Sequence, residues 1–134
     1  MPDYLFVYGT LHHSIKNEMS VFLSKNSDFI GDGFISGKLF DVGNYPALIL
    51  DTNSTVFGSI YQLKNELVLS ILDAYEGFDR QNPTESLYIR TQIDVKLQDK
   101  KSVNCWVYIY NKSTQNLKEI ESGNYLEYLK TKLD

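Results

Sequence analysis

Alternating apolar and polar positions predict most of the regular structure of this chain as β-strands. A short apolar and aromatic run near the start ends abruptly at Gly9, and longer alternating runs follow it. Successive side chains of a strand point to opposite faces, so alternation indicates a strand with one buried face. The predicted strands are residues 4–8, 55–63, 87–97 and 102–110.

A further stretch, residues 29–40, combines apolar side chains with Gly31, Gly33 and Gly37. Glycines inside a strand pattern mark the bulges and bends by which small barrels curve, although the same glycines also fit plain turns. The last two predicted strands are separated only by the polar residues 98–101, which is typical of an antiparallel hairpin.

Helical spacing replaces the alternation in two places. Residues 66–76 carry apolar side chains three and four positions apart, with Asn65 as a candidate N-cap and Gly77 as a candidate left-handed C-terminal cap. A second, short helix begins near Asn124. Its apolar stripe consists of Tyr125, Leu126, Leu129 and Leu133. Because strands dominate and crossover helices are few, we predict an α+β fold with a mainly antiparallel, partly closed sheet and a few flanking helices.

Composition bounds the possible functions. The chain has 134 residues, 43% of them apolar, which suffices for one hydrophobic core, so we expect a single domain over residues 1–134. No stretch approaches the roughly 18 apolar residues of a membrane span, and the start lacks a signal peptide, so a soluble cytoplasmic protein is predicted. A net charge of −4 argues against a nucleic-acid partner. Oligomeric state is left open.

Cysteine chemistry adds no candidate site. Cys105 is the only cysteine, so it cannot form an internal disulfide, and it lies within a predicted strand. We expect it to pack in the core as a small apolar residue.

Gly9 and Thr10 form the first candidate site, because they follow directly on a buried strand. A glycine there lets the backbone approach a ligand with its N–H groups exposed, which can form a nest for a carboxylate or an oxyanion. The same pair also fits a plain turn. A phosphate-binding loop is excluded, since the second glycine and the Gly-Lys-Ser/Thr ending are missing.

Glu76 is the second candidate, because it ends the predicted helix. The negative end of the helix macrodipole disfavours a carboxylate there by roughly 0.3–1 kcal/mol. If neighbouring side chains also bury it, desolvation raises its pKa further, toward the range useful for a general acid or base. The alternative is an ordinary exposed residue of the last turn.

Other chemistry has less support. Asp73 and Asp79 could join Glu76 in a metal site, but no histidine accompanies them and no carboxylate cluster is completed elsewhere, so we predict neither metal nor cofactor. His12 and His13 adjoin the glycine loop, and at most one of two adjacent residues can face a site. A serine hydrolase is excluded because no serine, histidine and acid pattern is present.

Several fragments, in order along nearly the whole chain, resemble the γ-glutamylcyclotransferase-like family. The most specific are Tyr8-Gly9-Thr10-Leu11 and the Tyr-Glu-Gly segment that contains Glu76. The others are 37–40 with Tyr45-Pro46, 56–58 with Tyr61, Tyr88 with Arg90, 106–110 and 122–125.

This resemblance implies a small mixed barrel in which backbone N–H groups of the loop, at Gly9, Thr10 and Leu11, bind a γ-glutamyl group. Glu76 matches the family's acid, which takes a proton from the substrate's own α-amino group. The amine then attacks the γ-carbonyl carbon and closes a five-membered ring, which releases 5-oxoproline and a free amine or amino acid without a cofactor. Tyr8, Tyr88 and Tyr125 match positions that bind the substrate.

A second hypothesis keeps the same fold without catalysis. The pocket would then only bind a small carboxylate or serve as an interaction module. Retention of Glu76 favours the enzyme, because a binder of a zwitterion has less use for an acid at a helix end. The amine that leaves cannot be named from the sequence.

Overall fold

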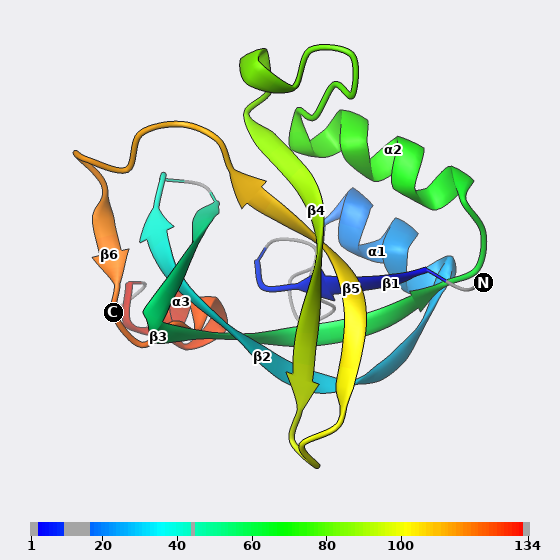
Figure 1. Cartoon of the computed structure of the whole chain (residues 1–134), viewed down its shortest axis with the longest axis horizontal. Coiled ribbons are helices and arrows are strands. Elements are labelled where there is room, and N and C mark those ends of the chain that lie inside the picture. Colours follow the sequence, from blue (N-terminus) through cyan, green and yellow to red (C-terminus); the bar gives the residue numbers. More distant parts are fainter. Residues whose placement is uncertain (1–2, 10–16, 44, 133–134) are drawn as a thin grey trace.

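The computed structural model describes residues 3–9, 17–43 and 45–132 (Figure 1). Their elements, in chain order, are β1 (Tyr4–Val7), α1 (Glu18–Lys25), β2 (Ser27–Asp41), β3 (Pro46–Leu63), α2 (Leu67–Glu76), η1 (Pro83–Glu85), β4 (Tyr88–Leu97), β5 (Ser102–Tyr110), β6 (Lys118–Ile120) and α3 (Tyr125–Lys132).

Five of the strands close into a barrel. Their order is β3-β1-β5-β4-β2, and β2 pairs again with β3, while β6 extends the sheet at β2. All pairings are antiparallel except that of β1 with β5, in which Leu5 lies opposite Trp106. In Figure 1, α1 and α2 lie together on one side of the barrel and α3 lies at the other end. The predicted α+β class with a mainly antiparallel, barrel-like sheet is confirmed.

The hairpin of β2 and β3 is longer than the sequence pattern indicated, since β3 begins at Pro46. Its register shifts between Phe29 and Gly31 and again between Ser36 and Gly37, so two of the glycines lie at irregularities of the strand. At Gly33 a Cβ atom would lie 2.7 Å from the Lys96 carbonyl oxygen. A glycine there lets β2 and β4 approach closely enough to close the barrel.

Two apolar clusters share the strands between them. In β1, Phe6 belongs to the cluster inside the barrel, whereas Leu5 and Val7 belong to the cluster beneath α1 and α2. This division follows from the two-residue period of a strand. Cys105 is fully buried in the barrel cluster, in the predicted manner. Each fully buried Val, Leu, Ile or Phe side chain of these clusters contributes about 1.5–3 kcal/mol through the hydrophobic effect.

Helix α2 ends where its sequence indicates. The N-cap is Glu66, which makes no side-chain capping bond, and not the predicted Asn65. Asn65 precedes it and accepts a hydrogen bond from the Leu67 N–H at 3.0 Å. Gly77 adopts the left-handed conformation with φ 72°, and the Phe78 N–H donates to the Asp73 carbonyl oxygen at 2.9 Å. These contacts fix the last turn of the helix, and with it the position of Glu76.

Helix α1 is an element that the periodicity did not predict. Asn17 and Ser20 form a capping box, in which the Asn17 side chain accepts from the Ser20 N–H at 2.8 Å and Ser20 Oγ accepts from the Asn17 N–H at 2.9 Å. The helix is only eight residues long, so its apolar stripe is too short to stand out in a sequence.

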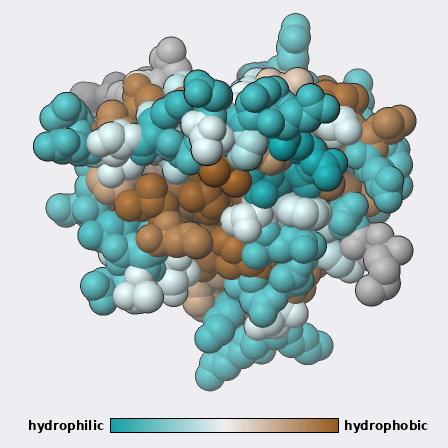
Figure 2. Space-filling model, turned by 45° about the horizontal axis from the view of Figure 1, so that its top comes forward, coloured by the Kyte–Doolittle hydropathy of each residue, from teal (hydrophilic) through white to brown (hydrophobic). Residues whose placement is uncertain are grey.

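The surface is mainly hydrophilic, with apolar residues gathered in a band across the face shown in Figure 2. Large apolar side chains with substantial exposure include Val21, Phe29, Phe57, Leu67 and Ile71. Among the helices of the described part of the chain, none has the length and apolar character needed to cross a membrane.

Candidate active site

A small cavity of about 30 Å³ opens where β1 ends. Its walls come from the end of β1, the start of β3, the last turn of α2 and the neighbouring strands β4 and β5. Among the residues that line it are Tyr8, Gly9, Pro46, Glu76, Tyr88 and Tyr108. Residues far apart in the sequence therefore meet at one place.

Glu76 is the acidic residue of this cavity. Its side chain is partly buried, and burial raises the pKa of its carboxyl to about 7. The cause of this shift is desolvation, which disfavours the charged carboxylate. A carboxyl with a pKa near neutrality can both accept and return a proton at physiological pH.

Two tyrosines that flank Glu76 are held by the backbone. The Tyr8 hydroxyl donates to the Tyr108 carbonyl oxygen, and the Tyr88 hydroxyl donates to the Pro46 carbonyl oxygen at 2.6 Å. Burial is the largest cause of the raised pKa of each phenol, and the charge of Glu76 raises both further. The phenols stay neutral, and their oxygen lone pairs are available to accept hydrogen bonds from a ligand.

Gly9 is tightly packed against the cavity wall. A Cβ atom at this position would lie 2.6 Å from Cγ of Pro46, so packing alone requires a glycine. Thr10, Leu11, His12 and His13 lie outside the described residues. The backbone nest of the loop therefore stays a prediction.

A buried ion pair anchors α2 to the barrel. Asp73, one turn before Glu76, accepts from the Arg90 guanidinium at 2.8 and 3.1 Å and from the Tyr108 hydroxyl at 2.8 Å. The Arg90 guanidinium also lies 4.3 Å from the ring centre of Trp106. Sequence reasoning left the role of Arg90 open, because nothing local connects it with a residue 17 positions away.

The contacts of Asp73 and Asp79 do not support a metal site. The Asp73 carboxylate is already held by Arg90 and Tyr108. Asp79 is exposed and accepts from the Gln81 N–H and the Asn82 side chain. Among the residues that the structure describes, no three His, Cys, Asp or Glu side chains form a group that could hold a metal ion.

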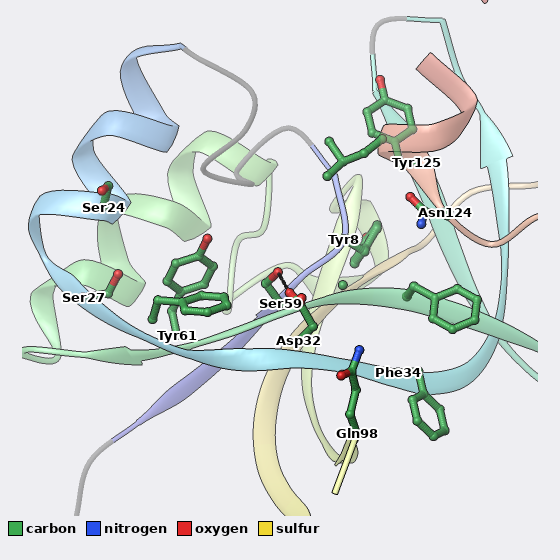
Figure 3. Close-up of a pocket in the computed structure, with 15 residues that line it drawn as sticks. Tyr8, Ser24, Ser27, Asp32, Phe34, Ser59, Tyr61, Gln98, Asn124 and Tyr125 are labelled. Carbon is green, nitrogen blue, oxygen red and sulfur yellow. Dashed lines mark hydrogen bonds between the residues drawn. The ribbon is translucent and has the colours of Figure 1, made fainter. Parts of the chain in front are cut away.

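Tyr125 lies apart from the small cavity. It lines a second cavity of about 940 Å³, which shares Tyr8 with the first (Figure 3). Tyr125 also contributes to the raised pKa of Tyr88, so the two phenols are within electrostatic reach of each other. The fold brings the predicted site residues Tyr8, Gly9, Glu76 and Tyr88 together in the small cavity. The predicted site residue Tyr125 lines the larger cavity instead.

Residues 5–127 match the sequence profile of the family described as gamma-glutamyl cyclotransferase, AIG2-like. The chain belongs to this family. A gamma-glutamylcyclotransferase family protein of Escherichia coli strain K12, YtfP, is 32% identical over 124 residues, which cover 92% of this chain and 96% of that protein.

Two other family relatives extend the comparison. A gamma-L-glutamyl-butirosin B gamma-glutamyl cyclotransferase of Niallia circulans is 33% identical over 84% of this chain and 69% of its own length. The crystal structure of an AIG2-like protein from Mus musculus superimposes with a TM-score of 0.72 at 29% identity, covering 90% of this chain and 87% of that one. The family expected from the sequence fragments is thereby confirmed.

Proposed function

We propose that this protein is a γ-glutamylcyclotransferase that converts a γ-glutamyl amine or γ-glutamyl amino acid to 5-oxoproline and the free amine. The observation that carries the proposal is the Glu76 carboxyl, whose pKa is raised to about 7 in the cavity that it shares with Tyr8 and Gly9. Family membership supports the same reaction class.

In the proposed reaction the Glu76 carboxylate takes a proton from the α-ammonium group of the substrate. The resulting amine attacks the γ-carbonyl carbon, a new C–N bond closes the five-membered lactam, and negative charge develops on the carbonyl oxygen. Glu76 returns its proton to the leaving nitrogen as the bond from that carbon to this nitrogen breaks, and then takes the second proton that the attacking nitrogen still carries, which leaves a neutral lactam. This second proton passes to the released amine, which departs as an ammonium group. All atoms of the substrate appear in the two products, and no water is consumed.

The proposed reaction is an intramolecular attack. Folding the substrate so that its own amine meets the carbonyl makes the reaction effectively unimolecular, which lowers the barrier without a second reactant. Backbone N–H groups at Gly9 and the following residues are the proposed donors to the developing oxyanion. Tyr8 and Tyr88 are proposed to accept hydrogen bonds from the substrate through their phenol oxygens.

The test is product formation. The purified protein, incubated with a mixture of γ-glutamyl amines and γ-glutamyl amino acids, is expected to release 5-oxoproline, detected by mass spectrometry. If ligands bind but no 5-oxoproline forms from any of them, the protein is a binding module on this fold instead.

The pH dependence of turnover follows from the state of Glu76. The proton-accepting form is the carboxylate, so kcat/KM is expected to rise as pH increases through the pKa of about 7 and then to level off. Below that pKa the rate should fall about tenfold per pH unit, because only the ionised fraction is active. Initial rates between pH 5 and 9 on one substrate check this, and a flat profile over that range would contradict the role of Glu76 as the base.

A further inference from the structure

The larger cavity lies on the outer face of β2 and β3, between α1 and α3 (Figure 3). Its volume is about 940 Å³, against about 30 Å³ for the cavity at Glu76. Tyr8 forms part of the wall of both. In the view of Figure 3, Asp32 and Ser59 lie between Tyr61 and Tyr8, and Tyr125 lies beyond them.

The small cavity cannot contain a whole substrate. A space of this size admits only one or two groups as large as a water molecule. A γ-glutamyl compound whose reacting atoms lie beside Glu76 must therefore place most of its atoms, the leaving group among them, outside this cavity. The larger cavity shares Tyr8 with the small one, and its volume of about 940 Å³ is ample for the leaving group of a small amide.

The wall of the larger cavity is aromatic and acidic. Phe29 and Phe57 line this cavity and are 53% and 46% exposed. Asp32 is exposed at the same wall, and its carboxylate accepts from the Ser59 hydroxyl at 2.8 Å. No Lys, Arg or second carboxylate is among the described residues that line this cavity. Aromatic faces and a carboxylate together favour a cation on an apolar chain.

We infer that the larger cavity binds the leaving amine of the substrate and that Asp32 selects amines that carry a second, positively charged amino group. The inference rests on the proposed cyclotransferase activity. It adds a substrate class, since a leaving amino acid would bring its own carboxylate toward Asp32, whereas a diamine brings an ammonium group. Asp32 is thus a specificity-determining residue outside the reacting centre.

Matched substrates test the charge preference. The γ-glutamyl amide of 1,4-diaminobutane ends in an ammonium group, and the γ-glutamyl amide of pentylamine has a methyl group at the same place. The wild-type protein is expected to show a KM about fivefold lower for the first, as suits an exposed ion pair. Their kcat values should be similar, because the reacting atoms are the same.

The variant Asp32→Asn tests whether Asp32 sets the preference for a positively charged leaving amine. Asparagine retains an oxygen that can accept from Ser59, so folding should be spared while the charge is lost. We expect the KM of the diamine derivative to rise about fivefold and that of the pentylamide to stay unchanged. Asp28→Asn is the matched control, because Asp28 is exposed on the same strand and does not line the cavity. Equal KM changes in the two variants, or none in either, would overturn the inference.

A binding measurement separates this inference from the catalytic proposal. Free 1,4-diaminobutane, titrated into the protein and followed by amide NMR shifts, should perturb residues around Asp32, with about fivefold weaker affinity in Asp32→Asn than in Asp28→Asn. If that difference appears while no substrate is cyclised, the cyclotransferase proposal fails and the amine site stands. If substrates are cyclised and the difference is absent, the amine site fails alone.

Discussion

We expect Glu76→Gln to lower kcat by a factor of about one hundred or more while leaving the fold and substrate binding intact. Glutamine preserves the shape and polarity of the side chain but cannot accept the proton of the α-ammonium group, and positioned proton transfer contributes about 10²–10⁴ to a rate. Steady-state release of 5-oxoproline gives kcat, and titration with an uncleaved substrate analogue gives the affinity.

The control for this variant is Glu66→Gln, the same change at the exposed residue just before α2. It should turn over at the wild-type rate. A Glu76→Gln protein that retained most of its turnover would remove Glu76 from the mechanism. Because burial disfavours the ionised carboxyl, Glu76→Gln should also be no less stable than the wild type near pH 8.

The second large effect is expected from Arg90→Met, which should lower the free energy of unfolding by about 3–5 kcal/mol. The Arg90 and Asp73 side chains are only 7% and 10% exposed, so removing the cation leaves a buried carboxylate without its counter-ion. Urea unfolding followed by circular dichroism measures the loss. The free energy of unfolding of Arg90→Lys should fall between those of the wild type and Arg90→Met, because lysine keeps the charge but not the two parallel hydrogen bonds.

A double variant shows whether the loss comes from the unpaired charge. Adding Asp73→Asn to Arg90→Met removes the carboxylate, so we expect part of the lost stability to return. If Arg90→Met alone unfolds within 1 kcal/mol of the wild type, the ion pair does not anchor α2. Since Asp73 lies one turn before Glu76, weakened anchoring should also reduce turnover in the single variant.

The sequence predicted the parts of the fold that repeat a local pattern. The alternation of residues 102–110 and the helical spacing before Gly77 each span many residues, so they identified β5 and α2 with nearly their observed bounds. Helix α1 and strand β6 are too short to show a period. The extension of β3 back to Pro46 also escaped prediction, because Asp51 to Ser54 are polar within a strand.

The candidate site could be proposed from the sequence only where one residue carries its own signal. Glu76 stands out because an acid at a helix C-terminus is unfavourable, and the loop at Gly9 follows a buried strand. The partnership of Asp73 with Arg90 depends on α2 crossing β4, which no local pattern encodes. Likewise, Tyr125 falls beside the larger cavity because α3 begins there, and the family motif alone could not separate the two cavities.

The parallel pairing of β1 with β5 has a consequence for synthesis of the chain. Leu5 finds its partner Trp106 only after about 100 further residues have been made, which takes roughly 5–20 s at ordinary ribosomal rates. During that interval an apolar, β-prone strand has at most one neighbour, β3, and its other edge is open to pairing with other chains. Closure of the barrel is therefore a late, long-range step, and one edge of the first strand stays unpaired until β5 emerges.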